Sequence, residues 1–320
     1  MRSLQIYALT GPDGIQPVDV PAPESSGKVV IQVRAVGMSY PDLLRSRGQY
    51  QERLEPPYAF GNEFAGTVVT GPAGSQWRSG DRVFGSVQGA AAELVAVDAD
   101  ALLRLPDRLT FEQGAALPLN YGTAIVALKF RGRIVAGERL LVLGAGGGTG
   151  TAALQVARAV GATTLAVVSD TRKADAARSA GADHVLMLSS TWKDHVLELT
   201  GGRGVDIIFD PVGGDQFLDT MRAVAPGGRW VIIGFVGGTI PQIPANRVLL
   251  RNMDVVGSSF GGYLRTVPAA SERLRAEMLD LLTNPAIEPI VGNTFVLEDA
   301  ARGLRMLERR QAVGKIVLTL

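Results

Sequence analysis

A glycine-rich segment, Gly144–Gly150, is the part of the chain best suited to chemistry, because glycine lets the backbone approach a ligand closely. It follows the aliphatic run Arg139–Leu143 and opens a segment with helical spacing, Gly148–Val160. A strand, a tight turn and a helix N-terminus together offer free N–H groups and a positive dipole end, which suit the phosphates of a dinucleotide. The spacing from Ala145 through Gly147 to Gly150 nearly matches the dinucleotide fingerprint. The residues predicted to meet the pyrophosphate are Gly146, Gly147, Gly148 and Thr149.

The end of the next predicted strand, Thr163–Val168, bears on the choice between NAD and NADP. The fingerprint expects an acidic side chain about 20 residues after the glycines, where it would bind the ribose 2′-hydroxyl of NAD. Here a hydroxyl and two cations follow the strand, at Ser169, Arg172 and Lys173. These groups suit a 2′-phosphate and favour NADP(H), although Asp170 would oppose the phosphate unless its side chain points away.

The elements that must position these residues alternate regularly after about Asn120. The predicted strands are Arg139–Leu143, Thr163–Val168, His184–Leu188, Val205–Phe209, Arg229–Ile233 and Met253–Ser258, and the predicted helices are Gly148–Val160, Thr171–Ala180, Thr191–Thr200 and Gln216–Val224. Such alternation is typical of a doubly wound parallel sheet.

The two ends of the chain have a different pattern. Short apolar runs separated by Gly, Pro and Asp predict strands at Lys28–Val36, Phe64–Val69, Arg82–Ser86 and Ala92–Val97. The last segment predicts helices at Glu272–Leu282 and Ala300–Glu308 and a strand at Lys315–Leu320.

Composition excludes several classes of protein. The chain has 320 residues, no cysteine, two histidines and a formal net charge of +1, so it forms no disulfide and no thiolate zinc site. The charge argues against a nucleic-acid partner. The N-terminal residues lack the apolar core of a signal peptide, and the least charged stretch, Leu140–Ser169, carries a glycine cluster and Arg158. We therefore expect a cytoplasmic protein with no membrane partner.

Short motifs in a shared order carry a family resemblance. They are Val36–Asp42, Arg47–Tyr50, Gly61–Gly66, Gly80–Val83, Leu117–Ala124, the glycine-rich segment and Gly314–Leu318. With them the chain resembles the medium-chain dehydrogenase/reductase superfamily, specifically its zinc-free NADPH:quinone oxidoreductase branch.

The resemblance implies an α/β architecture with two domains. It predicts a GroES-like β domain, begun by residues 1–118 and completed by residues 265–320, and a doubly wound Rossmann domain with a six-stranded parallel sheet over residues 119–264. It also implies a site in the cleft between these domains.

Departures from the zinc-dependent relatives predict that no metal is bound. The resemblance places Ser39 where those relatives have a cysteine ligand, Asn62 where they have a histidine, and Ala115 near the third ligand position. The lobe with four structural cysteines is missing as well. Both histidines, His184 and His195, fall in the cofactor domain, where we read them as scaffold residues.

The resemblance also implies which residues would contact substrate during hydride transfer from NADPH. Tyr50 is the candidate proton donor, with an aromatic lid as the alternative reading, and Ser39 and Asn62 would hydrogen-bond the substrate oxygen. Asp42 and Glu63 are expected to orient their neighbours.

Further positions implied by the resemblance concern the cofactor. Tyr40 and Lys315 would lie on the pyrophosphate side, and Thr123, at the start of a helix, near the nicotinamide or phosphates. Val212 would line the ribose. The nicotinamide would be framed by Gly234, Phe235, Val236, Ser258 and Phe260.

The predicted function is zinc-independent hydride transfer from NADPH to a quinone. One alternative is a reductase of α,β-unsaturated carbonyls or enoyl thioesters, and another is an NADPH-binding protein without catalysis. The family commonly pairs the last strand of two cofactor sheets, so the apolar run Asn252–Phe260 predicts a homodimer.

Overall fold

A computed structural model describes all residues from Met1 to Leu320. The chain forms two compact units: unit 1 comprises Met1–Leu119 and Val291–Leu320, and unit 2 comprises Asn120–Ile290. None of the helices is both long and apolar enough to cross a membrane.

Unit 1 is built on two sheets. The seven-stranded sheet has the order β15-β16-β3-β5-β6-β8, with β7 also paired to β3, and a three-stranded sheet has the order β2-β1-β4. The strands are β1 (Arg2–Ile6), β2 (Ile15–Asp19), β3 (Val29–Met38), β4 (Tyr58–Ala59), β5 (Glu63–Thr70), β6 (Arg82–Ser86), β7 (Leu94–Val97), β8 (Leu102–Arg104), β15 (Val291–Val296) and β16 (Lys315–Thr319). The short helical segments are η1 (Gly11–Gly14), α1 (Tyr40–Ser46), η2 (Ala99–Ala101), α2 (Phe111–Ala115), η5 (Leu297–Asp299) and α11 (Ala300–Glu308).

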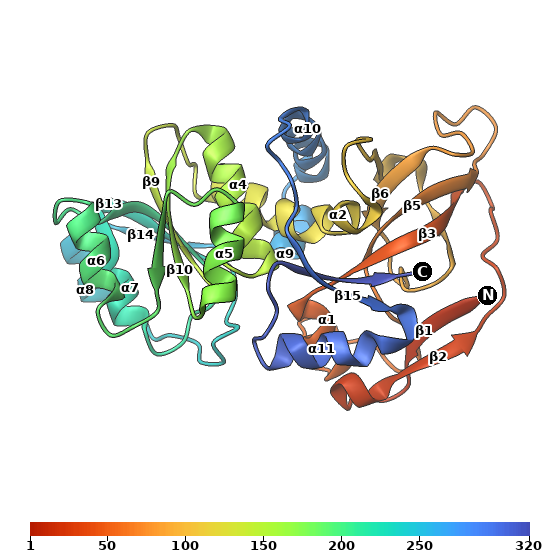
Figure 1. Ribbon diagram of the computed structural model, residues 1–320, viewed down its shortest axis with the longest axis horizontal. Coiled ribbons are helices and arrows are strands. Elements are labelled where there is room, and N and C mark those ends of the chain that lie inside the picture. Colours follow the sequence, from red (N-terminus) through yellow and green to blue (C-terminus); the bar gives the residue numbers. More distant parts are fainter. The chain divides into compact units, whose positions relative to one another are not determined.

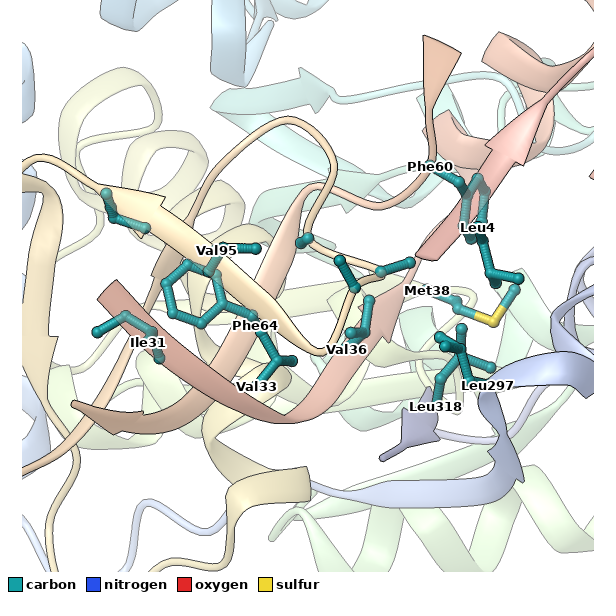
Figure 2. Packing of buried hydrophobic residues seen from close by; sticks show 14 of the residues in the cluster. Leu4, Ile31, Val33, Val36, Met38, Phe60, Phe64, Val95, Leu297 and Leu318 are labelled. Atoms are coloured by element: carbon teal, nitrogen blue, oxygen red, sulfur yellow. The ribbon is translucent and has the colours of Figure 1, made fainter. Parts of the chain in front are cut away.

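The core of unit 1 lies around the long central strand β3. Its buried side chains pack with Phe64 of β5, Val95 of β7 and Leu318 of β16, as Figure 2 shows. The antiparallel register places Leu318 opposite Val36, so the end of the chain completes the sheet begun near its start. The last strand of the chain therefore belongs to unit 1.

Unit 2 is a parallel six-stranded sheet in the order β11-β10-β9-β12-β13-β14. The strands are β9 (Arg139–Leu143), β10 (Thr163–Val168), β11 (His184–Met187), β12 (Val205–Asp210), β13 (Val224–Ile232) and β14 (Asp254–Gly257). The chain therefore starts in the centre, moves to one edge and then crosses to the other, which is the doubly wound order. The predicted α/β fold class is confirmed.

Helices cover both faces of this sheet (Figure 1). The helical segments of unit 2 are η3 (Leu117–Tyr121, begun in unit 1), α3 (Gly122–Ile125), η4 (Val126–Arg131), α4 (Gly148–Val160), α5 (Thr171–Ser179), α6 (Trp192–Leu199), α7 (Phe217–Ala223), α8 (Ala245–Arg251), α9 (Phe260–Thr266) and α10 (Ala270–Thr283). In Figure 1, α4 and α5 lie on one face of the sheet, and α6, α7 and α8 lie on the other.

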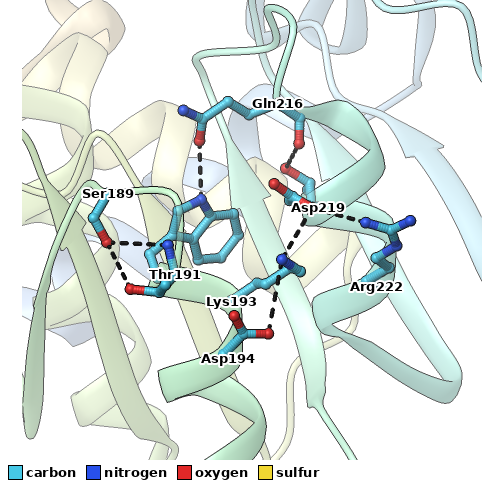
Figure 3. A network of polar contacts seen from close by, with 9 residues as sticks. Ser189, Thr191, Lys193, Asp194, Gln216, Asp219 and Arg222 are labelled. Atoms are coloured by element: carbon cyan, nitrogen blue, oxygen red, sulfur yellow. Dashed lines mark hydrogen bonds and ion pairs between the residues drawn. The ribbon is translucent and has the colours of Figure 1, made fainter.

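Polar contacts join α6 to α7 on their shared face (Figure 3). The Trp192 indole donates to Gln216 Oε1 at 2.9 Å, and Lys193 lies 3.5 Å from Asp219. Asp219 also accepts from Arg222 at 3.2 Å. Since Trp192 is otherwise enclosed by apolar side chains, its N–H needs this acceptor.

The segment 265–290 corrects the predicted domain boundaries. It was expected to complete the first domain, but it belongs to unit 2, where Lys129 of η4 forms an ion pair with Glu277 of α10. Gln155 of α4 also donates to the carbonyl oxygen of Glu288 at 2.7 Å. The helix itself was predicted, but an amphipathic pattern does not identify the surface on which the apolar face packs.

Candidate functional site

The glycine-rich segment is a turn from β9 into α4. Gly147 is the N-cap of α4 in extended conformation, and Gly161 ends the helix with a left-handed φ of 89°. A Cβ added at Gly147 would meet only the Gly144 oxygen, at 3.6 Å, so the protein itself leaves space there. This opening at the N-terminus of a 13-residue helix suits a phosphate group.

Two other glycines of the turn are required by the protein's own packing. A Cβ at Gly150 would lie 2.4 Å from the Gly144 oxygen, so only glycine lets the first turn of α4 pack this closely against the segment that leads into it. A Cβ at Gly146 would lie 2.3 Å from the Cβ of Lys173. Gly146 therefore allows the start of α5 to pack against the turn, a constraint that the motif alone did not reveal.

The side chains after β10 form a small polar cluster. Lys173 donates from Nζ to Ser169 Oγ at 2.8 Å and lies 3.4 Å from the Asp170 carboxylate. Asp170 caps α5 by accepting the Lys173 N–H at 3.1 Å. Burial alone would raise the pKa of Asp170, but the N–H and ammonium of Lys173 hold it below its ordinary value. Asp170 is thus turned into its own helix, and Arg172 is an exposed cation without a hydrogen bond or ion pair.

The remaining predicted cofactor residues of unit 2 gather at one edge of the sheet. Val212, Gly234 and Ser258 lie within two residues of the ends of β12, β13 and β14, and the carboxyl ends of parallel strands share an edge. Phe235 is exposed and Val236 half-buried beside Gly234. Ser258 is 4% exposed, and its hydroxyl is buried without a partner. A buried hydroxyl without a partner is costly for the protein unless a ligand satisfies it.

Asp210, a functional candidate that the sequence reading missed, holds one loop of this edge. Its carboxylate accepts the N–H groups of Val212 at 2.8 Å and Gly213 at 2.9 Å, and the Trp230 indole at 2.9 Å. No cation pairs with it, and burial raises its pKa. The position of an acid at the end of a strand, before Pro211, was the available signal.

Thr123 lies near the Phe260 ring, and it is the second residue of α3 in a continuous helical run. A Cβ at Gly122 would lie 2.8 Å from the Phe260 ring, so this ring packs on the residue beside Thr123. Thr123 is 6% exposed and sits within a helical run, because the π-helix η3 leads directly into α3. The N–H groups at the start of α3 are therefore not those of a free helix N-terminus.

The residues of unit 2 fit a dinucleotide phosphate with an extra anionic group. Space opens at Gly147, the exposed cation Arg172 follows the adjacent strand, and the unpartnered Ser258 hydroxyl lies at the same edge of the sheet.

Asp42 organises the predicted polar residues of unit 1. Its carboxylate, 2% exposed, accepts the Ser39 N–H at 2.8 Å, the Ser39 hydroxyl at 2.6 Å and the Asn62 amide at 2.9 Å. Ser39 and Asn62 are thus brought together as expected. However, the Ser39 hydroxyl gives its proton to Asp42, so only Asn62 keeps an N–H to donate elsewhere.

Tyr50 lies in the loop after α1, next to Arg45. The Arg45 guanidinium stacks on the Tyr50 ring at 4.6 Å and forms an ion pair with Glu52 at 3.2 Å. Tyr58, which the sequence reading did not single out, belongs to the same neighbourhood, since both Arg45 and Asp42 act on its pKa. No local sequence signal marks this tyrosine.

Lys315 and Tyr40, which the resemblance places on the pyrophosphate side, both belong to unit 1. Lys315 forms an ion pair with Glu63, and both side chains are 2% exposed. A Cβ at Gly37 would lie 2.7 Å from Lys315 and 2.8 Å from Glu63, so glycine makes room for the pair. The ammonium of Lys315 is therefore enclosed in unit 1, and the Tyr40 ring packs against the core of that unit.

Glu63 also orients the chain near it, as expected. It accepts the Leu119 N–H at 3.0 Å. Burial raises the pKa of the Glu63 carboxyl, and the Lys315 ammonium and this N–H offset part of the rise.

Metal-ligating side chains are not grouped in either unit. No three or more His, Cys, Asp or Glu side chains lie where they could hold one metal ion. His184 and His195 are exposed on β11 and α6.

Comparison with known proteins identifies both parts of the chain. Residues 25–107 match the alcohol dehydrogenase GroES-like domain, and residues 148–283 match the zinc-binding dehydrogenase family. Quinone oxidoreductase-like protein 2 of Bos taurus is 36% identical over 305 residues, which cover 94% of this chain and 87% of that protein.

Solved structures agree over the full length. A probable oxidoreductase from Mycobacterium abscessus superposes with a TM-score of 0.89 at 37% identity, covering 100% of this chain and 99% of that one. The quinone oxidoreductase of Thermus thermophilus, also solved in complex with NADPH, gives a TM-score of 0.83 at 34% identity, covering 100% of both chains. The chain therefore belongs to the medium-chain dehydrogenase/reductase superfamily, in its zinc-free quinone oxidoreductase branch.

Proposed function

We propose that this protein is an NADPH-dependent, zinc-independent quinone oxidoreductase. The observation that carries the proposal is the open carboxyl edge of the unit 2 sheet, where Gly147, Arg172 and Ser258 are left available by the protein's own contacts. Two similar proteins support the proposal. One is the quinone oxidoreductase-like protein of Bos taurus, and the other is the Thermus thermophilus quinone oxidoreductase, which was also solved in complex with NADPH.

In this proposal unit 2 binds the cofactor. The N–H groups at the start of α4 hold the pyrophosphate, Arg172 pairs with the 2′-phosphate, and Lys173 with Ser169 supports the same group. The Lys173 ammonium offsets the charge of Asp170 and so reduces its repulsion of the phosphate. Ser258 donates to the nicotinamide end. NADPH, when bound, supplies the hydride.

Unit 1 binds the acceptor. Asp42 fixes the amide of Asn62, whose second N–H is directed to the acceptor oxygen, and Tyr50 contacts the acceptor from the adjoining loop. A quinone is activated already, so hydrogen-bond donors at its oxygens are sufficient, and positioning provides most of the rate. Ser39 acts through Asp42 rather than as a donor to the acceptor.

A reductase of enones or enoyl thioesters is the second candidate. Its substrate requires a proton as well as a hydride, and the phenol of Tyr50 beside Arg45 is the observation that favours it. Binding of NADPH without catalysis is the third candidate.

Acceptor panels distinguish the three functions. NADPH oxidation is followed by absorbance with benzoquinones, naphthoquinones and phenanthrenequinone, and in parallel with enones and a crotonyl thioester. We expect turnover with quinones. Turnover confined to enones would select the second candidate, and tight NADPH binding without any turnover would select the third. Tyr50→Phe should abolish reduction only if Tyr50 donates the proton.

Gly147→Ala tests the cofactor site separately from folding. Because a Cβ there meets nothing closer than 3.6 Å, the fold should tolerate it, whereas KM for NADPH should rise about tenfold as the pyrophosphate is displaced. Gly71→Ala is a matched control, since its Cβ would also find ordinary space, at 3.5 Å. An unchanged KM for NADPH in Gly147→Ala would show that the pyrophosphate does not bind at this turn.

Arg172→Ala tests the preference for NADPH. It should raise KM for NADPH and spare NADH, because only NADPH carries the 2′-phosphate. An equal loss for both cofactors would contradict the assignment of Arg172.

We also propose a homodimer formed through the edge of the unit 2 sheet. The strand β14 is an edge strand, and Leu249 and Leu250 of the neighbouring segment α8 are 74% and 77% exposed. Light scattering should give the mass of two chains, and a Leu249→Glu/Leu250→Glu variant should shift it toward one. A monomeric wild-type mass contradicts the proposal.

A further inference from the structure

Two buried polar atoms of unit 1 have no hydrogen-bond partner and lie in the same neighbourhood. They are Nε of Arg45 and the hydroxyl of Tyr58. Only two other side-chain atoms of the protein share this condition, on Arg229 and Ser258. Because folding removes such donors from water, each is costly unless another molecule provides an acceptor.

Both side chains are held in place by other contacts. The Arg45 guanidinium stacks on the Tyr50 ring at 4.6 Å, and its terminal nitrogen pairs with Glu52 at 3.2 Å, so its Nε–H direction is set. Tyr58 starts β4, where its backbone pairs with Ile6 of β1, and its side chain packs against the core of unit 1. Neither donor is a mobile surface group that points inward by chance.

The Tyr58 hydroxyl stays protonated at neutral pH. Burial raises its pKa to about 12, the Arg45 guanidinium opposes this rise, and the Asp42 carboxylate adds to it. The group is therefore available as an O–H donor in the same region as Asp42, which orients Asn62.

We propose that the Tyr58 hydroxyl and the Arg45 Nε–H form a two-donor subsite for a carbonyl oxygen of the acceptor. This inference rests on the proposed quinone reductase function. After hydride transfer that oxygen carries negative charge, and a guanidinium beside an O–H donor stabilises an oxyanion more than a neutral carbonyl. Both donors are enclosed in the structure, and Arg45 is closed in by the loop with Tyr50 and Glu52, so the acceptor enters as this loop opens.

Tyr58→Phe gives opposite results for a binding role and a purely structural one. If the hydroxyl binds the acceptor, KM for 1,4-naphthoquinone rises about tenfold while KM for NADPH stays within about twofold. If the hydroxyl has no ligand, the phenylalanine removes an unsatisfied buried group, so Tm stays equal or rises and KM is unchanged. The second result overturns the proposal.

Two further variants complete the test of the subsite, one at its second donor and one as a control. Arg45→Lys keeps the positive charge but lacks the Nε–H, and should also raise KM for the quinone, in the same direction as Tyr58→Phe. Tyr7→Phe, at a tyrosine that is 44% exposed, is the matched control and should match wild type. Wild-type quinone affinity in both Arg45→Lys and Tyr58→Phe would overturn the subsite.

A direct binding measurement separates this proposal from the function on which it rests. Naphthoquinone is titrated calorimetrically into protein saturated with NADP⁺, where no turnover occurs. Wild-type binding that is weakened about tenfold in Tyr58→Phe supports the subsite even if no acceptor is reduced, which would defeat only the proposed reaction. Equal binding by both proteins, or no quinone binding by wild type, overturns the subsite.

Discussion

Glu63 in unit 1 and Asp210 in unit 2 are both almost fully buried carboxylates, but they have different partners. Glu63 pairs with the Lys315 ammonium and accepts one backbone N–H. Asp210 has no cation and accepts two backbone N–H groups and an indole N–H. The burial of each raises its pKa.

The position of each acid in its sheet explains the difference. Glu63 starts β5, a strand paired on both sides, with Gly37 of β3 and Ser86 of β6. Nearby backbone N–H groups there are used by the ladder, so a cationic side chain supplies the compensation. Asp210 ends β12, where the chain turns and the N–H groups of Val212 and Gly213 are free to bind it. At a position paired on both sides, such as Glu63, a distant cation supplies the compensation, whereas the turn after β12 provides Asp210 with its own donors.

Lys315→Met should have the largest effect, because it leaves the Glu63 carboxylate buried without its cation. We expect a loss of about 4 kcal/mol in the free energy of unfolding, measured by chemical denaturation. The double variant Glu63→Gln/Lys315→Met should recover much of this loss, since no charge remains buried. A Lys315→Met variant as stable as wild type would show that the pair is not the main compensation.

Asp210→Asn should have a smaller effect. The amide oxygen can still accept from Val212 and Gly213, but the amide N–H₂ meets the Trp230 indole as donor against donor. We expect about 2 kcal/mol of destabilisation.

Asp210→Ala, which leaves all three donors without an acceptor, is the matched comparison. It should cost more than Asp210→Asn and also raise KM for NADPH, because the loop with Val212 is released. Equal losses in the two variants would mean that the backbone hydrogen bonds contribute nothing.

The smallest effect is on the pH dependence of stability. Asp210 has a raised pKa, so the folded protein binds this proton more tightly than the unfolded chain does. The contribution of this group is therefore fully present below the ordinary value of 3.8 and is lost as pH rises through the native pKa. Its slope is at most about 1.4 kcal/mol per pH unit.

The measurement is the difference in unfolding free energy between wild type and Asp210→Asn across this acidic range. Wild-type stability should decline relative to the variant as pH rises. A constant difference would mean that the three N–H donors balance the effect of burial on the pKa, and wild-type stability that rises relative to the variant would mean that they outweigh it.

Local features of the chain made much of unit 2 predictable. The bounds of β9, α4 and β10 agree with the prediction, because aliphatic runs, a glycine turn and the left-handed Gly161 are signals within a few residues. The predicted Ser169, Arg172 and Lys173 follow β10 for the same reason. By contrast β1, β2 and α1 were not predicted, since their sequences carry no strong periodicity.

The hydrogen-bond partners of individual side chains were less predictable than the positions of helices and strands. The family resemblance placed Ser39 and Asn62 at a common site, but it did not show that Asp42 would accept the hydrogen bond of the Ser39 hydroxyl. Tyr58 was missed because an isolated tyrosine after two prolines gives no pattern, and only its burial beside Arg45 distinguishes it.

The sequence by itself determined the doubly wound sheet, the phosphate-suited turn at Gly147 and the absence of cysteine ligands, all of which depend on residue type and short-range spacing. Only the tertiary structure decided that Lys315 pairs with Glu63, 252 positions away in the chain, and that residues 265–290 pack in unit 2. It also decided that Arg45 and Tyr58 each keep a buried donor without a hydrogen-bond partner. These outcomes depend on sheet register and on the surface each helix meets, which bring together residues far apart in the chain.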